Sequence, residues 1–304
     1  MTGAIDGMPA LVSVVIPHFN QVTAAARCLQ SLREQSWPVE QTEVILVDNG
    51  SIQDLAPLRS AFPEVTFLVE TQAGPGPARN LGARTARGSL LAFIDADCRA
   101  DPDWLRQAVA ALAAPDSTGV VGGDVRIDFV DPARPTALEG YEAVFAFRQR
   151  EYIDKMRFSG TGNLAVVADV WAQVGPFGGI GIAEDRDWGQ RAAAAGHPAR
   201  YVPGMVVYHP ARAAFADLES KWRRHIAHDR AGPRGRSRLR WLGLTAATLL
   251  SAIPHGVRLL VSSRLPGWRG RMGGLAVLFR IRAFRALEML RVAGGADTSG
   301  DWSR

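Results

Sequence analysis

One stretch restricts the fold more than any other, the run Leu91-Ala92-Phe93-Ile94-Asp95-Ala96-Asp97. Four apolar residues are followed at once by two carboxylates one residue apart. The run is too short, and ends too abruptly, to be a helix, so it predicts a buried strand of a parallel sheet. Open α/β sheets bind ligands at the carboxyl ends of their strands. The end of this strand is therefore the first candidate site.

The two aspartates that follow the strand predict a cation. In a strand continued by one more pair, Asp95 and Asp97 would lie on the same face. Two carboxylates on one face repel each other unless a cation lies between them. Carboxylate oxygens favour Mg²⁺ or Mn²⁺, with a substrate diphosphate completing the coordination shell. The alternative is a strand end with two solvated aspartates, because D-x-D alone is a common pattern.

The length and the charge of the chain limit its possible size of core and its possible partners. The 304 residues are enough for a large core and an extension. Residues 1–211 carry 17 basic and 24 acidic side chains, a net charge of −7. Residues 212–292 carry 17 and 4, a net charge of +13. A basic block after an acidic domain indicates an anionic partner, either nucleic acid or a membrane.

The cysteines and the N-terminus indicate the compartment. Cys28 and Cys98 lack the spacing of metal ligands and are too few for a disulfide framework. A reducing cytoplasm fits this usage. The N-terminus has no charged region followed by an apolar stretch, so we expect no signal peptide.

The first hundred residues alternate between strand and helix patterns. Strands are predicted at 12–17, 44–47, 65–69 and 91–94, with helices at 22–35, 52–61 and from about 77 to 88. This order predicts a doubly wound sheet of the nucleotide-binding type. Asp48, Arg79 and Asp95 follow or lie near strand ends, so we expect them to converge on one crevice.

The next hundred residues add further elements. Asp101 is expected to cap a helix, and 120–128 and 201–208 are expected to be strands. A small-residue turn at 158–163 enters another strand. A helix is predicted from Glu184 to Ala195. Acidic residues in its first turn are favourable at a helix N-terminus, which is sufficient reason for their presence without any catalytic role.

Five motifs follow one another along residues 11–211. They are Ser13-Val14-Val15-Ile16-Pro17-His18-Phe19-Asn20, Val47-Asp48-Asn49-Gly50-Ser51, Ala78-Arg79-Asn80-Leu81-Gly82, Asp95-Ala96-Asp97 and Glu184-Asp185-Arg186-Asp187-Trp188-Gly189-Gln190-Arg191. In this order they resemble the motifs of the family 2 glycosyltransferases, and the resemblance implies the GT-A fold, a nucleotide-diphospho-sugar donor, a divalent metal and inversion at the anomeric carbon. Tyr208-His209 resembles the late histidine of the family.

The resemblance gives roles to individual residues. Asp97 would bind Mn²⁺ or Mg²⁺, with Asp95 and His209 as further ligands, although a histidine at a strand end needs no such role. Asp48 would accept a hydrogen bond from the base or ribose, and Arg79 would neutralise the diphosphate or hold the base. The nucleotide-sugar site would consist of Pro17, Phe19, Asn20, Asp48, Arg79 and Asp95.

Direct inversion needs a base that takes the proton of the acceptor hydroxyl. The resemblance gives this role to Asp185, with Glu184 as an acceptor contact or a helix cap. Trp188 stands where the family usually has Leu; its ring would stack on a sugar or, alternatively, pack under the sheet. The expected acceptor-side residues are Gly160, Asn163, Glu184 and Trp188.

The basic extension, residues 212–304, predicts helices. The apolar stretch 241–263 contains Pro254, His255 and Arg258, which argues against a clean membrane span. Residues 275–290 mix arginines with Leu, Val, Phe and Met, a mix that suits a helix lying in a membrane interface. We expect Leu275, Leu278 and Phe279 to insert. The alternative is a helical hairpin packed on the catalytic domain. Nucleic acid is not expected, since no nucleic-acid motif accompanies the charge.

The combined expectation is an α/β protein with a GT-A, Rossmann-like doubly wound mixed sheet (1–211) and a basic helical extension (212–304). It would be cytoplasmic and peripheral at the inner face of the cell membrane. It would move a sugar from a nucleotide-diphospho-sugar, of which a UDP-sugar is the expected form, to a lipid-linked or polysaccharide acceptor. The alternatives are a nucleotidyltransferase acting on sugar phosphates and a non-catalytic protein that tethers a complex to membrane.

Overall fold

The computed structural model describes residues 11–231 and 237–295, which form two compact units. The first contains the chain up to Arg126 together with 148–209, and the second contains 127–147 together with the chain from Pro210. The sequence placed 127–147 in the catalytic domain, whereas the structure groups this segment with the basic extension. Arg234 and Arg236, which the sequence placed in a basic loop, lie outside the described residues.

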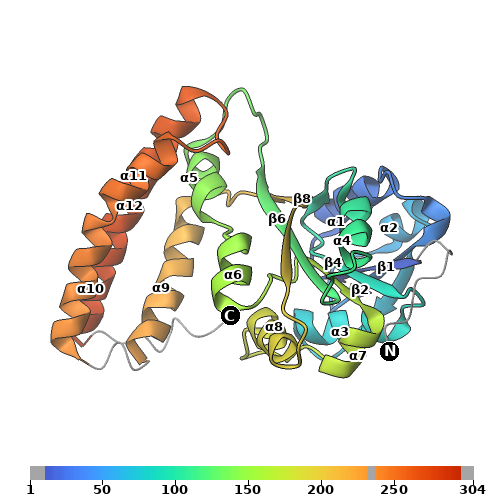
Figure 1. The fold of residues 1–304 in the computed structure, drawn as a ribbon. Coiled ribbons are helices and arrows are strands. Elements are labelled where there is room, and N and C mark those ends of the chain that lie inside the picture. Colours follow the sequence, from blue (N-terminus) through green and yellow to red (C-terminus); the bar gives the residue numbers. More distant parts are fainter. Residues whose placement is uncertain (1–10, 232–236, 296–304) are drawn as a thin grey trace. The chain divides into compact units, whose positions relative to one another are not determined.

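The first unit is built on a mixed sheet, whose strands β1, β2, β4, β6 and β8 are labelled in Figure 1. The strand order is β3-β2-β1-β4-β7-β6-β8-β5. The four strands nearest the N-terminus are mutually parallel, and β7 is antiparallel to β4 and to β6. The strands are β1 (Val12–His18), β2 (Thr42–Asp48), β3 (Thr66–Val69), β4 (Leu90–Ile94), β5 (Arg99–Ala100), β6 (Val120–Asp128), β7 (Asn163–Val167) and β8 (Arg200–Pro210). The predicted mixed α/β sheet is confirmed.

The apolar run of residues 91–94 lies in β4, and all five residues of this strand are buried. Burial on both faces explains why the run shows no alternation of polar and apolar residues. Helices of this unit are α1 (Val22–Arg33), α2 (Ala56–Ala61), α3 (Pro75–Thr85), α4 (Trp104–Leu112), α6 (Gln149–Met156), α7 (Ala168–Val174) and α8 (Glu184–Ala194), with the short 3₁₀ turn η1 (Val39–Gln41).

Three local expectations differ from the structure. The first strand continues through Pro17 to His18; β4 pairs with β1 only up to Val15, so the missing N–H of proline interrupts no ladder there. The helix predicted from 52 begins at Ala56. Asp101 is not the residue directly before α4, which begins at Trp104 after Asp103; the Asp101 carboxylate accepts instead from the Asp103 N–H over 3.2 Å in the turn before the helix.

The strand β4 ends at Ile94, and the next four residues form a turn closed by the Cys98 N–H donating to the Asp95 carbonyl (3.0 Å). The expected continuation of the strand is therefore wrong. The positions of Asp95 and Asp97 follow from this turn and not from strand alternation.

The second unit is helical. Its helices are α5 (Ala137–Phe145), α9 (Phe215–Ala231), α10 (Arg238–Leu250), α11 (Ala252–Leu260) and α12 (Gly267–Ala293), and α12 contacts each of the other four (Figure 1). Glycines allow α5 and α12 to approach closely: a Cβ added at Gly140 would lie 2.2 Å from the Gly270 carbonyl oxygen. This close approach explains why 127–147 belongs to the second unit.

The apolar stretch 241–263 forms parts of two helices, because α10 ends at Leu250 and α11 begins at Ala252. Pro254 lies in the first turn of α11, where its missing N–H breaks no helical hydrogen bond. Within residues 11–231 and 237–295, no helix has the length and apolar character needed to cross a membrane. Leu278 is fully buried in a cluster with Tyr141 and Ile281, so the expectation that it inserts into a membrane is wrong.

Candidate active site

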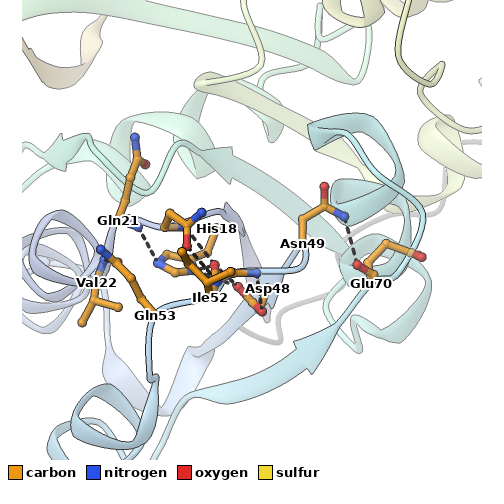
Figure 2. A network of polar contacts seen from close by, with 10 residues as sticks. His18, Gln21, Val22, Asp48, Asn49, Ile52, Gln53 and Glu70 are labelled. Carbon is orange, nitrogen blue, oxygen red and sulfur yellow. Dashed lines mark hydrogen bonds and ion pairs between the residues drawn. The ribbon is translucent and has the colours of Figure 1, made fainter. Parts of the chain in front are cut away.

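The site begins where β1 and β2 end side by side, with His18 in register with Asp48. His18 is 1% exposed. Its Nδ1 lies 3.0 Å from Oδ1 of Asp48, and its Nε2 accepts from the Gln21 N–H over 3.2 Å, so these partners assign the proton to Nδ1 (Figure 2). Burial alone would raise the pKa of Asp48, but the hydrogen bonds from Ser51 and His18 outweigh burial and hold it below its usual range. The network fixes both strand ends.

Asn49 ties the glycine- and proline-rich loop to this strand end. Its Oδ1 accepts from the Gly74 N–H over 2.6 Å, and its Nδ2 donates to the carbonyls of Glu70 (3.0 Å) and Gln72 (2.8 Å). Figure 2 shows the contact with Glu70. Gly74 has φ +119°, a conformation that a residue with a side chain rarely adopts. These contacts fix the loop, and they therefore fix the position at which α3 begins beside the site.

A second loop is held by α3. Asn80 donates from Nδ2 to the Phe177 carbonyl (2.9 Å) and accepts at Oδ1 from the Phe177 N–H (2.8 Å). A Cβ added at Gly76 would lie 2.0 Å from the Gly178 carbonyl oxygen, so only glycine allows this approach. These contacts hold the segment that carries Ile180 beside the site.

Arg79 joins the end of β4 to the start of α8. The residue is 4% exposed, and its Nη2 donates to Oδ1 of Asp95 over 2.6 Å while its Nη1 donates to Oε1 of Glu184 over 3.1 Å. Its Nε is buried without a hydrogen-bond partner in the described part of the chain. The guanidinium thus lies between the carboxylates of Asp95 and Glu184 and neutralises part of their charge.

These elements enclose a cavity of about 620 Å³. Six of the residues predicted for donor, metal or acceptor lie on its walls, namely Pro17, Phe19, Arg79, Asp95, Asp97 and Glu184. Phe19 is 57% exposed, which leaves its ring face available for stacking. The cavity is of the size of a small-molecule site.

Asp97 and His209 come together at the edge of the sheet. The pairing of β5 with β8 aligns Arg99 with Tyr208, so the residues just outside this pair meet. Nε2 of His209 lies 3.5 Å from Oδ2 of Asp97. Burial raises the pKa of Asp97; the charge of Asp95 adds to this effect and His209 opposes it.

A carboxylate and an imidazole this close together are a donor set that would fit Mn²⁺. The described residues contain no group of three or more His, Cys, Asp or Glu side chains that would hold a metal ion by themselves. If Asp97 and His209 both bound such an ion, coordination positions would remain for substrate oxygens.

The three acidic side chains at the start of α8 have different partners. Glu184 is paired with Arg79, and Asp187 accepts from Nε of Arg191 over 2.9 Å. Oδ1 of Asp185 accepts only from the backbone N–H of Arg186 (2.7 Å) among the hydrogen bonds of the described chain. Burial raises the pKa of Asp185 above its ordinary value, and the neighbouring charge of Glu184 adds to the rise. Asp185 thus differs from Glu184 and Asp187, each of which pairs with an arginine.

Two of the expected acceptor-side residues, Trp188 and Asn163, are buried in the scaffold, and for Trp188 this is the alternative of packing under the sheet. The ring of Trp188 is 1% exposed, packs 5.2 Å from the Phe177 ring and donates from Nε1 to the Gly175 carbonyl. Asn163 is 0% exposed; it accepts from Nε1 of Trp104 and donates to the carbonyls of Asp124 and Met205. Both side chains hold the scaffold together, and neither presents a polar atom to an acceptor.

Asn20 and Gly160 have contacts that the sequence did not predict. Asn20 has φ +53°, its N–H donates to Ser51 Oγ (2.8 Å) and its Oδ1 accepts from the Ile52 N–H (2.9 Å). It therefore shapes the loop behind the cavity together with Asp48. Gly160 donates from its N–H to Oε1 of Gln149 (3.1 Å) and starts the turn into β7.

Sequence reasoning gave no role to several residues of the cavity wall, among them His18, Asn49 and Ile180. His18 and Asn49 lie within motifs that were quoted, but no role was given to them; a polar residue directly after a buried strand was the available signal. Ile180 carried no signal, because its position depends on the contacts between α3 and the segment 176–178.

Known glycosyltransferases resemble this chain in sequence. The profile of the family "Glycosyl transferase family 2" matches residues 13–170. The glycosyltransferase AglE of Haloferax volcanii is 35% identical over 218 residues, 69% of this chain and 70% of AglE. Validoxylamine A glucosyltransferase of Streptomyces hygroscopicus subsp. jinggangensis is 34% identical over 128 residues, 40% of this chain and 30% of that protein.

Solved structures are similar in fold. The mannosyltransferase PcManGT from Pyrobaculum calidifontis, in complex with GDP-Man and Mn²⁺, has a TM-score of 0.56 at 17% identity, over 94% of this chain and 87% of that one. TarS 1-349 of S. aureus, in complex with UDP, has a TM-score of 0.52 at 15% identity, over 94% and 92%. The GT-A fold is confirmed. By its sequence profile and its similarity to AglE, the chain belongs to glycosyl transferase family 2.

Proposed function

We propose that this glycosyltransferase moves a sugar from a nucleotide-diphospho-sugar to an acceptor hydroxyl with inversion and with the help of a divalent metal. One observation carries the proposal: Asp95, Asp97, Arg79 and the start of α8 meet around a single cavity. The donor class is supported by the fold neighbours, which were solved with GDP-Man and Mn²⁺, with UDP and with UDP-GlcNAc. A UDP-sugar is the donor we propose for this chain.

In this proposal the nucleotide enters between the ends of β1 and β2. The ring of Phe19 stacks on the base, and Pro17 forms the wall beside it. Asn20 and Asp48 shape this end of the cavity through Ser51. Arg79 keeps Asp95 oriented towards the ribose and lowers the repulsion between the carboxylates and the diphosphate.

Asp97 and His209, with Asp95 nearby, would hold Mn²⁺ or Mg²⁺. When bound, such an ion neutralises the charge that develops on the departing nucleoside diphosphate. In the absence of a cation, burial disfavours the ionised form of Asp97, which is the form that would bind the metal.

Asp185 would be the general base. Inversion needs the acceptor oxygen to approach the anomeric carbon from the side opposite to the leaving diphosphate. A carboxylate whose pKa is raised by burial is a stronger base than an exposed one. Arg79 holds Glu184, the neighbour of Asp185, so the same guanidinium links the donor end of the cavity to the base. We retain Gly160 and Glu184 as acceptor-side residues.

The acceptor we propose is lipid-linked or a polysaccharide, and the site of action is the cytoplasmic face of the cell membrane. The net charge of +13 over residues 212–292 supports a peripheral association with an anionic bilayer.

The experiment that tests the reaction is a screen of nucleotide-sugars for metal-dependent hydrolysis by the full-length chain, with water in place of the acceptor. We expect release of one nucleoside diphosphate, faster with Mn²⁺ than with EDTA. The anomeric configuration of the first-formed free sugar, read by NMR before mutarotation, then tests inversion. Hydrolysis that releases pyrophosphate, or no turnover of any donor, would contradict the proposal.

A further inference from the structure

The second unit has an exposed apolar surface that its own helices do not cover. Among the described residues, twenty large apolar side chains are exposed, and thirteen of them lie between 239 and 290. Single apolar side chains scattered over a protein surface are normal, but such a concentration in one part of the chain is not. The surface therefore needs a partner.

On α10, α11 and the residue that follows α11, the large exposed apolar residues other than Leu244 follow a helical repeat. They recur every three or four positions and so form one stripe on the side away from the buried Trp241, Ala252 and Leu259. The stripe consists of Leu239, Leu242, Ala246, Leu249, Leu250, Ile253, Val257 and Val261. Ile253 is 67% exposed and Val257 58%.

A second stripe runs along α12 with the same spacing. Its members are Trp268, Met272, Ala276, Phe279, Ala283, Leu287 and Leu290, and all seven are exposed. Trp268 is 66% exposed, a large value for a tryptophan. The opposite side of α12 packs on α5 and α9 through Gly274 and Ile281.

The two stripes face the same side of the second unit. Nε1 of Trp241 in α10 donates to the Met289 carbonyl, and Arg271 near the start of α12 donates to the Leu260 carbonyl, so α10 and α11 run antiparallel to α12 (Figure 1). Leu275 and Met289 mark the side of α12 that meets α10 and α11, about a quarter turn from the apolar stripe. With this arrangement the stripes join into one surface, which we call the α10–α12 face.

The charges around the α10–α12 face have one sign. Arg240 and Arg258 are exposed beside the stripe on α10 and α11, and Arg269 and Arg280 are exposed beside the stripe on α12. Glu288 is the one acidic residue between 231 and 295 in the sequence; it is 7% exposed and is paired with Arg291. The face is thus apolar in its middle and positive at its edges.

We propose that the α10–α12 face lies flat on an anionic lipid bilayer, with Trp268, Ile253 and their neighbours in the headgroup region. An apolar middle with positive edges is the pattern of an interfacial helix. A second copy of the chain would bring like charges together, and nucleic acid would leave the apolar stripes in water. The inference rests on the membrane association proposed above and identifies the surface that makes it.

The test uses the full-length chain and vesicles of phosphatidylcholine with or without phosphatidylglycerol, read by flotation. The variant is Ile253→Gln with Val257→Gln; both side chains are exposed and glutamine is a good helix former, so folding is retained. The matched control is Val39→Gln with Ile52→Gln, two exposed apolar residues of the first unit at 75% and 93%. We expect the wild type and the control to float with anionic vesicles, less so at high salt, and the variant to bind at least about tenfold more weakly.

Trp268 gives an independent readout. Its emission should shift to the blue on anionic vesicles and be quenched by brominated lipid, and Trp268→Phe should remove most of this signal. A variant that binds as tightly as the wild type overturns the assignment of the face, whereas a wild type that ignores anionic vesicles overturns the membrane association itself. A wild type that is dimeric without lipid, and becomes monomeric in the variant, assigns the face to a second copy instead. Donor hydrolysis in lipid-free buffer reports on the sugar chemistry separately.

Discussion

Nε2 of His209 lies 3.5 Å from Oδ2 of Asp97, although the two residues are far apart in the sequence. Their meeting depends on a two-residue strand, β5, which pairs with the end of β8. Asp97 and His209 form the centre of the proposed metal site.

Asp97→Ala should abolish the coupling between metal and nucleotide. In the wild type, calorimetry should show that a nucleoside diphosphate binds more tightly in the presence of Mn²⁺, because an ion held by Asp97 would also neutralise the diphosphate. The matched control is Asp116→Ala, whose carboxylate is 77% exposed and lies at a surface ion pair. Unchanged coupling in Asp97→Ala would remove Asp97 from the metal site.

Asp185→Asn should lower turnover by ~10²–10⁴-fold, the usual contribution of a positioned base. Donor affinity should barely change. Because burial raises the pKa of Asp185, the wild-type rate should fall as the pH drops through a value above the ordinary 3.8 of an aspartate. A pH–rate profile of wild type and variant measures both effects. Full turnover in the variant would transfer the role to Glu184.

Arg79→Lys should destabilise the protein by about 1–3 kcal/mol and weaken donor binding, because a lysine cannot reach Asp95 and Glu184 at once. Thermal unfolding and nucleotide titration measure the two effects. Arg33→Lys is the control: Arg33 pairs with Glu64 at the surface, so this change should stay within about 0.5 kcal/mol. Equal effects of the two substitutions would mean that the ion pairs of Arg79 with Asp95 and Glu184 stabilise the protein no more than an ordinary surface ion pair.

Asp48→Asn should lower the free energy of unfolding by about 1–3 kcal/mol at pH 7, the cost of losing hydrogen bonds to a charged group. The pKa of Asp48 is lower in the folded state than its ordinary value of 3.8. The ionised carboxylate therefore contributes stability above pH 3.8, and this contribution is lost as the pH falls through the folded-state pKa. Urea titrations at pH 7 and pH 3 should show the gap between wild type and variant closing at the lower pH. A gap of constant size would rule out the charge as its cause.

Trp188→Phe should lower stability by about 1 kcal/mol while leaving the acceptor KM unchanged, since the ring is buried and its Nε1 bonds to the Gly175 carbonyl. Steady-state kinetics at saturating donor, together with thermal unfolding, separate the two readouts. A raised acceptor KM with unchanged stability would restore Trp188 to the acceptor side.

The sequence by itself determined the elements that carry the site. The buried strand before Asp95, the alternation of strands and helices, and the positions of Asp48, Arg79 and Asp97 near strand ends all follow from local pattern. The reason is that the period of apolar residues records which side of an element faces the core. The order of the parallel strands then brings their carboxyl ends to one edge.

The tertiary structure decided what each side chain touches. Trp188 and Asn163 stand in stretches that also suit an acceptor site, and only packing shows that both are buried. Leu278 and Phe279 are neighbours in one amphipathic stretch, yet the first is inside the helical unit and the second is half exposed. Such differences depend on which distant helix covers a given face and on the register between strands such as β5 and β8. These contacts join residues far apart in the chain, so no local pattern of residues records them.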